Sequence, residues 1–237
     1  MKAALALCTS LLVTPAVADP VVVFAAASLK EPLDMLAATG DVVVSYGGSG
    51  ALARQVSLGA PADIILLAND AWMQNLVTAG IVTDVADFAS NALVLIGPPD
   101  APDIDIGALP SLLADSKLAM GFFNAVPAGI YGRAAFENLG VWDAIAPNVV
   151  AVDNVRAALA LVARKEAAFG VTYATDARAT RDVRIVANFD PADHPVIRYT
   201  GARVSDNPDA LAFWALLRGP QGQAALAGFG FLPPVPQ

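Results

Sequence analysis

Four short stretches of this chain have the residue types that begin a helix able to bind an anion. Each joins small, polar or turn-forming residues to a helical run, and two of them carry a serine, Ser28 or Ser49. A helix N-terminus presents unpaired backbone N–H groups and about half a positive charge. Several such ends directed at one point would bind an oxyanion without Lys or Arg. The sequence therefore indicates a receptor for a small oxyanion, with its site built from residues 27–31, 47–52, 126–131 and 153–157.

Each of these features also has an ordinary structural interpretation. Serine is a common N-cap residue, so Ser28 and Ser49 could be caps and nothing more. Tyr173, at the end of an apolar run, is the kind of residue that usually lies in a core. Arg156, in the first turn of the fourth helix, is expected to be solvent-exposed or in a surface ion pair. At this point both the ligand-binding and the capping interpretations stay open.

Ser49 also supports a different hypothesis, that of a serine hydrolase. Residues 47–51 read Gly-Gly-Ser-Gly-Ala, one residue short of the G-x-S-x-G nucleophile elbow. Such an enzyme would need His194, the only histidine, as its base. We see no glycine-rich oxyanion motif to support it. Because His194 is alone, a histidine-based metal site is not expected either, and neither is a cofactor.

The composition narrows the class of protein further. The chain has 237 residues and a formal net charge of −8, which argues against nucleic-acid binding. Residues 1–18 resemble a secretory signal peptide, with Lys2, an apolar run and an A-x-A site, so we expect a periplasmic protein. The only cysteine, Cys8, would be removed with this leader. The remainder would then have no thiol chemistry.

The apolar runs that must position these residues alternate between strand and helix patterns. This alternation predicts parallel α/β sheets, which bind ligands at the carboxyl ends of their strands, where Ser28 and Ser49 fall. Pro220 and the Pro-rich end are expected to stop regular structure, and residues 98–110 read as a loop. Strands are predicted at 21–25, 42–44, 63–67, 93–96, 118–122, 169–173, 183–186 and 196–204. Helices are predicted at 29–39, 51–58, 69–76, 134–139, 155–164 and 209–217.

Two sets of such elements predict two α/β lobes. We expect the chain to cross between them near residues 90–98 and 188–200. The predicted division is residues 19–95 plus 196–237 in the first lobe and residues 96–195 in the second.

Taken together, these motifs resemble one family, the periplasmic molybdate-binding proteins of ABC importers. The likeness covers nearly the whole chain after the leader, in order. It rests on residues 23–29, on Ser49 with 52–55, and on 59–63, 126–131, 154–162 and 171–176. The resemblance implies a two-lobed periplasmic binding protein of type II that performs no chemistry and closes on its ligand. We expect it to act as a monomer that delivers its ligand to an inner-membrane ABC permease.

In that family neutral groups hold the tetrahedral oxyanion. The resemblance assigns this role to the hydroxyl and N–H groups of Ser28 and Ser49, the N–H groups of Ala128 and Val155, and the hydroxyl of Tyr173. Molybdate, and tungstate of nearly equal size, carries no proton at neutral pH and only accepts hydrogen bonds. A site of donors alone would reject protonated phosphate, because a buried unmatched proton costs about 1–3 kcal/mol. Sulfate would be excluded by size only, so a receptor for another oxyanion such as sulfate stays an alternative.

The sequence departs from the family pattern at two places beside the expected site. Before Val126 the family has a small polar stretch, whereas this chain has Phe122, Phe123 and Asn124. Around Ser49 the family is often serine-rich, whereas this chain is glycine-rich. Both departures bear on the choice of anion and leave the class of binding protein unchanged.

Overall fold

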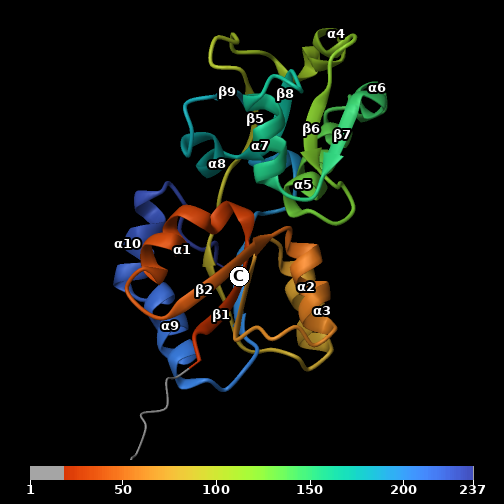
Figure 1. The fold of residues 1–237 in the computed structure, drawn as a ribbon. Helices are drawn as coiled ribbons and strands as arrows, with labels where there is room; N and C mark the ends of the chain where they lie inside the picture. Colours follow the sequence, from red (N-terminus) through yellow and green to blue (C-terminus); the bar gives the residue numbers. More distant parts are fainter. Residues whose placement is uncertain (1–18, 237) are drawn as a thin grey trace, which may run out of the picture.

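The computed structural model describes residues 19–236, which form two lobes, each a five-stranded sheet with helices on both faces (Figure 1). The predicted leader, including Cys8, lies outside the described residues. Within the described residues no helix is both long and apolar enough to span a membrane.

The first sheet has the strand order β2-β1-β3-β10-β4. Strand β1 runs parallel to β2 and β3, whereas β10 runs antiparallel to β3 and β4. The sequence did not predict β4, because its residues TDVADFA mix acidic and apolar types and most of the strand is solvent-accessible. The strands are β1 (Val21–Ala26), β2 (Val42–Gly47), β3 (Ile64–Leu67), β4 (Thr83–Ala89) and β10 (Tyr199–Arg203).

The second sheet, of order β7-β6-β8-β5-β9, repeats this arrangement. Its strand β6 is parallel to β7 and β8, and β5 is antiparallel to β8 and β9. In each sheet the fourth strand is the one that follows a crossing between the lobes, β10 in the first and β5 in the second. The strands are β5 (Leu93–Gly97), β6 (Leu118–Gly121), β7 (Val149–Val152), β8 (Phe169–Tyr173) and β9 (Arg184–Asn188).

The first crossing lies within the expected range of residues 90–98, but before the expected domain boundary at residue 95. Strand β5 already belongs to the second sheet, so the expected boundary at residue 95 falls inside it, and the chain crosses at residues 90–92. The second crossing lies between the end of β9 at Asn188 and the start of β10 at Tyr199. An apolar run shows that a strand exists but not which sheet it joins.

Helices cover both faces of each sheet. In the first lobe α1, α9 and α10 lie on one side and α2 and α3 on the other (Figure 1). Alternate residues of the strands serve the two faces: Ile64 and Leu66 pack in one apolar cluster, Ile65 and Leu67 in another. The helices of the first lobe are α1 (Lys30–Ala37), α2 (Ser49–Ser57), α3 (Asp70–Thr78), α9 (Pro208–Arg218) and α10 (Pro220–Gly228), with a 3₁₀ turn at Ala27–Leu29.

The second lobe has two longer helices, α5 and α7, and three of only four or five residues. The helices of this lobe are α4 (Leu109–Leu113), α5 (Pro127–Asn138), α6 (Trp142–Ile145), α7 (Val155–Ala163) and α8 (Ala174–Arg178), with 3₁₀ turns at Ile106–Ala108, Ala146–Asn148 and Pro191–Asp193.

Two sequence predictions about proline-rich segments were wrong. Pro220 does not stop regular structure, since it is the first residue of α10, where a helix needs no N–H donor. The predicted loop 98–110 contains the 3₁₀ turn Ile106–Ala108 and the start of α4. Here Pro110 again lies in the first turn of a helix.

Candidate ligand-binding site between the lobes

The five residues predicted to bind an anion all line one small pocket where the two lobes meet. Ser28 and Ser49 come from the first lobe, and Ala128, Val155 and Tyr173 from the second. The pocket has about 210 Å³ of space free of protein atoms, part of it open to solvent. None of its lining residues carries a formal charge. Besides the five predicted contacts, the lining residues are Ala26, Ala27, Gly47, Gly48, Ala68, Val126, Pro127 and Asn154.

Helix beginnings supply most of this lining, as the sequence predicted. Ser49 and Val155 are the first residues of α2 and α7, and Ala128 is the second residue of α5. Ser28 lies in the 3₁₀ turn that follows β1. No side chain caps α2 or α5, so their first N–H groups remain available.

The N-cap of α7, Asn154, leaves one backbone N–H of the first turn without a side-chain acceptor. The side-chain oxygen of Asn154 accepts from the N–H groups of Arg156 and Ala157, at 2.9 and 3.0 Å. The N–H of Val155, the predicted ligand contact, takes no part in this cap.

Both serine hydroxyls are buried, with 1% of each residue exposed, and both are held by hydrogen bonds. Ser49 Oγ accepts from the N–H of Ala68 at 3.0 Å. Since its oxygen already accepts there, the Ser49 proton is free to donate elsewhere. Ser28 Oγ lies 2.8 Å from the hydroxyl oxygen of Tyr199. Neither serine is an N-cap of the usual kind, because neither hydroxyl binds the first turn of its own helix.

Tyr173 brings an unpartnered hydroxyl to the same pocket. The residue is 1% exposed, and its hydroxyl has no hydrogen-bond partner within residues 19–236. Burial raises the pKa of Tyr173 well above its usual range, so the group stays protonated. A buried unpaired hydroxyl costs free energy, and an acceptor bound in the pocket would remove that cost.

Charged groups lie behind the pocket and not in it. Arg156 Nε is 2.6 Å from Asp176 Oδ1, and the same guanidinium contacts Glu31 of the first lobe, Nη1 to Oε1, at 2.8 Å. Asp176 is buried and also accepts from the N–H of Tyr173 at 3.2 Å. Burial raises the pKa of Asp176 to about 6, although Arg156 acts in the opposite direction. Arg156, expected to be solvent-exposed or in a surface ion pair, is part-buried and pairs with the buried Asp176 as well as with Glu31.

Close backbone contacts show that the lobes are closed. A Cβ atom on Gly48 would lie 2.3 Å from the carbonyl oxygen of Asp153 in the other lobe. Trp72 Nε1 donates across the interface to the carbonyl of Ala125 at 3.0 Å. Asn69 Nδ2 donates across it to the Tyr131 hydroxyl, also at 3.0 Å.

The structure does not bring Ser49 and His194 together, as the serine hydrolase hypothesis requires. His194 does not line the pocket that contains Ser49. Its Nδ1 is 2.8 Å from the carbonyl oxygen of its neighbour Pro195, and its ring lies against Tyr131.

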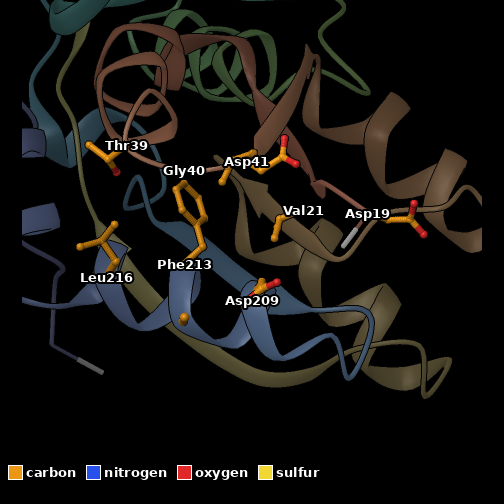
Figure 2. Close-up of a pocket in the computed structure, with 10 residues that line it drawn as sticks. Asp19, Val21, Thr39, Gly40, Asp41, Asp209, Phe213 and Leu216 are labelled. Carbon is orange, nitrogen blue, oxygen red and sulfur yellow. The ribbon is translucent and has the colours of Figure 1, made fainter. Parts of the chain in front are cut away.

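A second pocket, on the first lobe, has the wrong charge for an anion (Figure 2). Three carboxylates line it, those of Asp19, Asp41 and Asp209, beside the apolar side chains of Val21 and Phe213. Like charges would repel an oxyanion there. Within residues 19–236 no group of three or more His, Cys, Asp or Glu is placed to hold a metal ion.

The departure at residues 122–124 lies outside the lining of the site. Phe123 packs edge-on against Trp142 at 5.4 Å between ring centroids, and Phe122 is partly exposed.

Sequence reasoning missed Tyr199, which contacts Ser28 but is 171 residues away in the chain. No spacing pattern could have linked these two residues.

Comparison with known proteins places this chain in a family. Residues 21–232 match the model of a family described as bacterial extracellular solute-binding protein. The chain is 36% identical over 226 residues to the molybdate-binding protein ModA of Escherichia coli, covering 89% of this chain and 88% of that one. It is also 36% identical to ModA of Haemophilus influenzae, with 89% of each chain covered.

Solved structures show the same fold. A periplasmic molybdate-binding protein of Azotobacter vinelandii superposes with a TM-score of 0.78 at 21% identity, over 92% of this chain and all of that one. The substrate-binding domain of a putative molybdenum ABC transporter of Clostridium difficile gives a TM-score of 0.68 at 28% identity, over 92% and 99%. The predicted two-lobed α/β class is confirmed, and the chain belongs to the family of bacterial extracellular solute-binding proteins.

Proposed function

We propose that this protein captures molybdate, and tungstate as well, in the periplasm and delivers it to an inner-membrane ABC permease. The observation that carries the proposal is the pocket itself. Hydroxyl and N–H donors from both lobes converge there, and no charged side chain lines it. A fully deprotonated tetrahedral oxyanion accepts hydrogen bonds at every oxygen, so this set of groups matches it. The relatives named as molybdate-binding proteins support the same choice.

Capture by closure follows from the distribution of the donors. Ser28 and Ser49 lie on one lobe, and Ala128, Val155 and Tyr173 on the other. An anion that binds both sets stabilises the closed state over the open state by its contacts to the second lobe. We further propose that the protein acts as a monomer, and that the permease recognises the closed form.

Calorimetric titration tests the proposal directly. The purified protein is titrated with molybdate, tungstate, sulfate and phosphate in turn. We expect tight one-to-one binding of molybdate and tungstate and much weaker binding of the other two anions. Tight sulfate binding with weak molybdate binding would replace the proposed ligand by sulfate. No binding of any tetrahedral oxyanion would overturn the proposal.

A further inference from the structure

Behind Ser28 lies a buried hydroxyl that the proposed function does not use, that of Tyr199. Tyr199 is the first residue of β10, where the chain enters the first lobe after the second crossing. Its side chain is fully buried, edge-on to the rings of Phe88, Phe231 and Tyr173. Its hydroxyl oxygen lies 2.8 Å from Ser28 Oγ. Distance alone does not tell which of the two oxygens donates.

Asn91, in the first crossing, settles the direction. Its Oδ1 accepts from the N–H of Ala92 at 3.0 Å, which fixes the orientation of the amide. Its Nδ2 therefore points the other way and donates to Thr175 Oγ1 at 2.8 Å and to the Tyr199 hydroxyl at 3.3 Å. Each of the two amide protons has one acceptor.

The Tyr199 hydroxyl consequently accepts from Asn91 and needs an acceptor for its own proton. Within residues 19–236 the only acceptor in hydrogen-bond contact with it is Ser28 Oγ. The hydrogen bonds thus run from Asn91 to Tyr199 to Ser28. The proton of Ser28 cannot point back at Tyr199, so it points at the pocket.

We propose that Asn91 and Tyr199 fix Ser28 as a hydrogen-bond donor, and that this polarity makes the pocket select oxyanions without a proton over oxyanions with one. The inference rests on the proposed function, in which Ser28 contacts the anion. A serine hydroxyl can donate and accept, so Ser28 alone would tolerate either kind of anion. A protonated anion could donate to the second lone pair of Ser28, but the serine proton would then have no acceptor in the pocket and would have to turn towards Tyr199. There it would meet the proton that Tyr199 donates.

The isosteric substitution Asn91→Asp tests this polarity. A carboxylate can still accept from Ala92 but offers no proton to Tyr199, so Tyr199 donates to Asp instead and accepts from Ser28. Ser28 then presents lone pairs to the pocket. The affinities for molybdate and for phosphate are measured at about pH 8, where both are dianions and phosphate keeps one proton. We expect the ratio of the molybdate affinity to the phosphate affinity to fall about tenfold or more, the effect of one mismatched buried hydrogen bond.

The ratio separates polarity from charge, because the new carboxylate repels two dianions alike. Asn69→Asp is the matched control. Asn69 is also buried between the lobes and donates to a tyrosine hydroxyl, that of Tyr131, but neither group contacts a pocket serine. The Asn69→Asp substitution adds the same charge as Asn91→Asp and should leave the ratio of molybdate affinity to phosphate affinity unchanged. An Asn91→Asp ratio equal to that of the wild type would overturn the inference, whereas a wild type that binds no molybdate would overturn the proposed function.

A double-mutant cycle serves as an independent test if Asn91→Asp does not fold, as judged by circular dichroism. Tyr199→Phe removes the proton that orients Ser28 and should weaken molybdate binding about three- to tenfold. In a Ser28→Ala background the same change should have no effect, because Tyr199 acts through Ser28. Equal losses in both backgrounds would show that Tyr199 only packs, and would overturn the inference.

Discussion

Arg156 on the second lobe forms an ion pair with Glu31 on the first lobe. The two side chains are 21% and 32% exposed. Arg156 is next in the chain to Val155, which lines the pocket, and Glu31 follows Ser28 by three residues. The pair therefore joins, across the two lobes, the chain segments that follow Ser28 and Val155, directly behind the candidate site. It can exist only when the lobes are closed.

Breaking this pair should weaken ligand binding without changing the pocket. In Glu31→Gln the closed state loses an ion pair while every proposed ligand contact remains, so we expect affinity to fall about two- to fivefold. Calorimetry measures the loss, which should shrink at high salt because the wild-type pair is partly screened. Asp34→Asn is the control, because Asp34 pairs with Lys30 within α1 and does not cross the interface. Equal affinities for wild type and Glu31→Gln would show that the pair does not stabilise closure.

Asp176 should make the fold less stable as pH rises through weakly acidic values. Its pKa in the folded protein is about 6, above the ordinary 3.8, because burial disfavours the carboxylate. Between these values the folded state binds more protons than the unfolded state, so the contribution of Asp176 to stability is full below about pH 4 and is lost by about pH 6.

The variant Asp176→Asn should remove that pH dependence. Arg156 keeps Glu31 as a partner in this variant. We expect the unfolding free energy of the variant, relative to wild type, to rise between about pH 4 and pH 6 and then level off. Denaturant titrations at several pH values measure it, with the exposed Asp143→Asn as control. A difference that is constant with pH would contradict the raised pKa.

The sequence was sufficient to predict the features that depend on neighbours in the chain. Ser28, Ser49, Ala128 and Val155 each belong to a local strand-to-helix or cap pattern, and the structure brings them to one pocket. Their role as ligand contacts stays a prediction. The alternating apolar strands gave the α/β class for the same reason. Strand β4 escaped prediction because its burial increases along its length and does not alternate, so the sequence shows no apolar period of two.

Features that depend on distant pairing could not be predicted. Tyr199 and Arg156 act through partners 171 and 125 residues away, with no periodic pattern to reveal them. Arg156 even has the sequence context of a surface residue, since its helix is short and follows a turn. Only the folded positions of Glu31 and Asp176 show that its guanidinium is held between carboxylates.

Removing either pocket hydroxyl should weaken anion binding. We expect Ser28→Ala and Ser49→Ala each to cost about 1–3 kcal/mol of molybdate binding, the cost of one unmatched buried acceptor. Ser49→Ala should also lower the melting temperature, because it leaves the buried N–H of Ala68 without its acceptor. Ser57→Ala is the control, since that hydroxyl bonds only the carbonyl of Ala53 within α2. If both single variants bound molybdate like wild type, the site assignment would be wrong.

Adding one methyl group at Gly48 should block closure while leaving each lobe folded. The backbone of Gly48, with φ −72° and ψ 135°, is accessible to alanine, so Gly48→Ala brings no backbone strain. Its Cβ would lie 2.3 Å from the backbone oxygen of Asp153, a group that cannot turn aside as a side chain can.

The lobes of Gly48→Ala would have to stay apart, and the anion would lose contacts to the second lobe. We expect affinity to fall about tenfold or more, consistent with the cost of overpacking a close contact. Small-angle scattering should show no compaction on adding molybdate. Gly228→Ala is the matched control, because a Cβ there meets nothing within 4 Å. Wild-type affinity and compaction in Gly48→Ala would mean that the ligand-bound state is more open than this structure, and that the contact at Asp153 is not part of it.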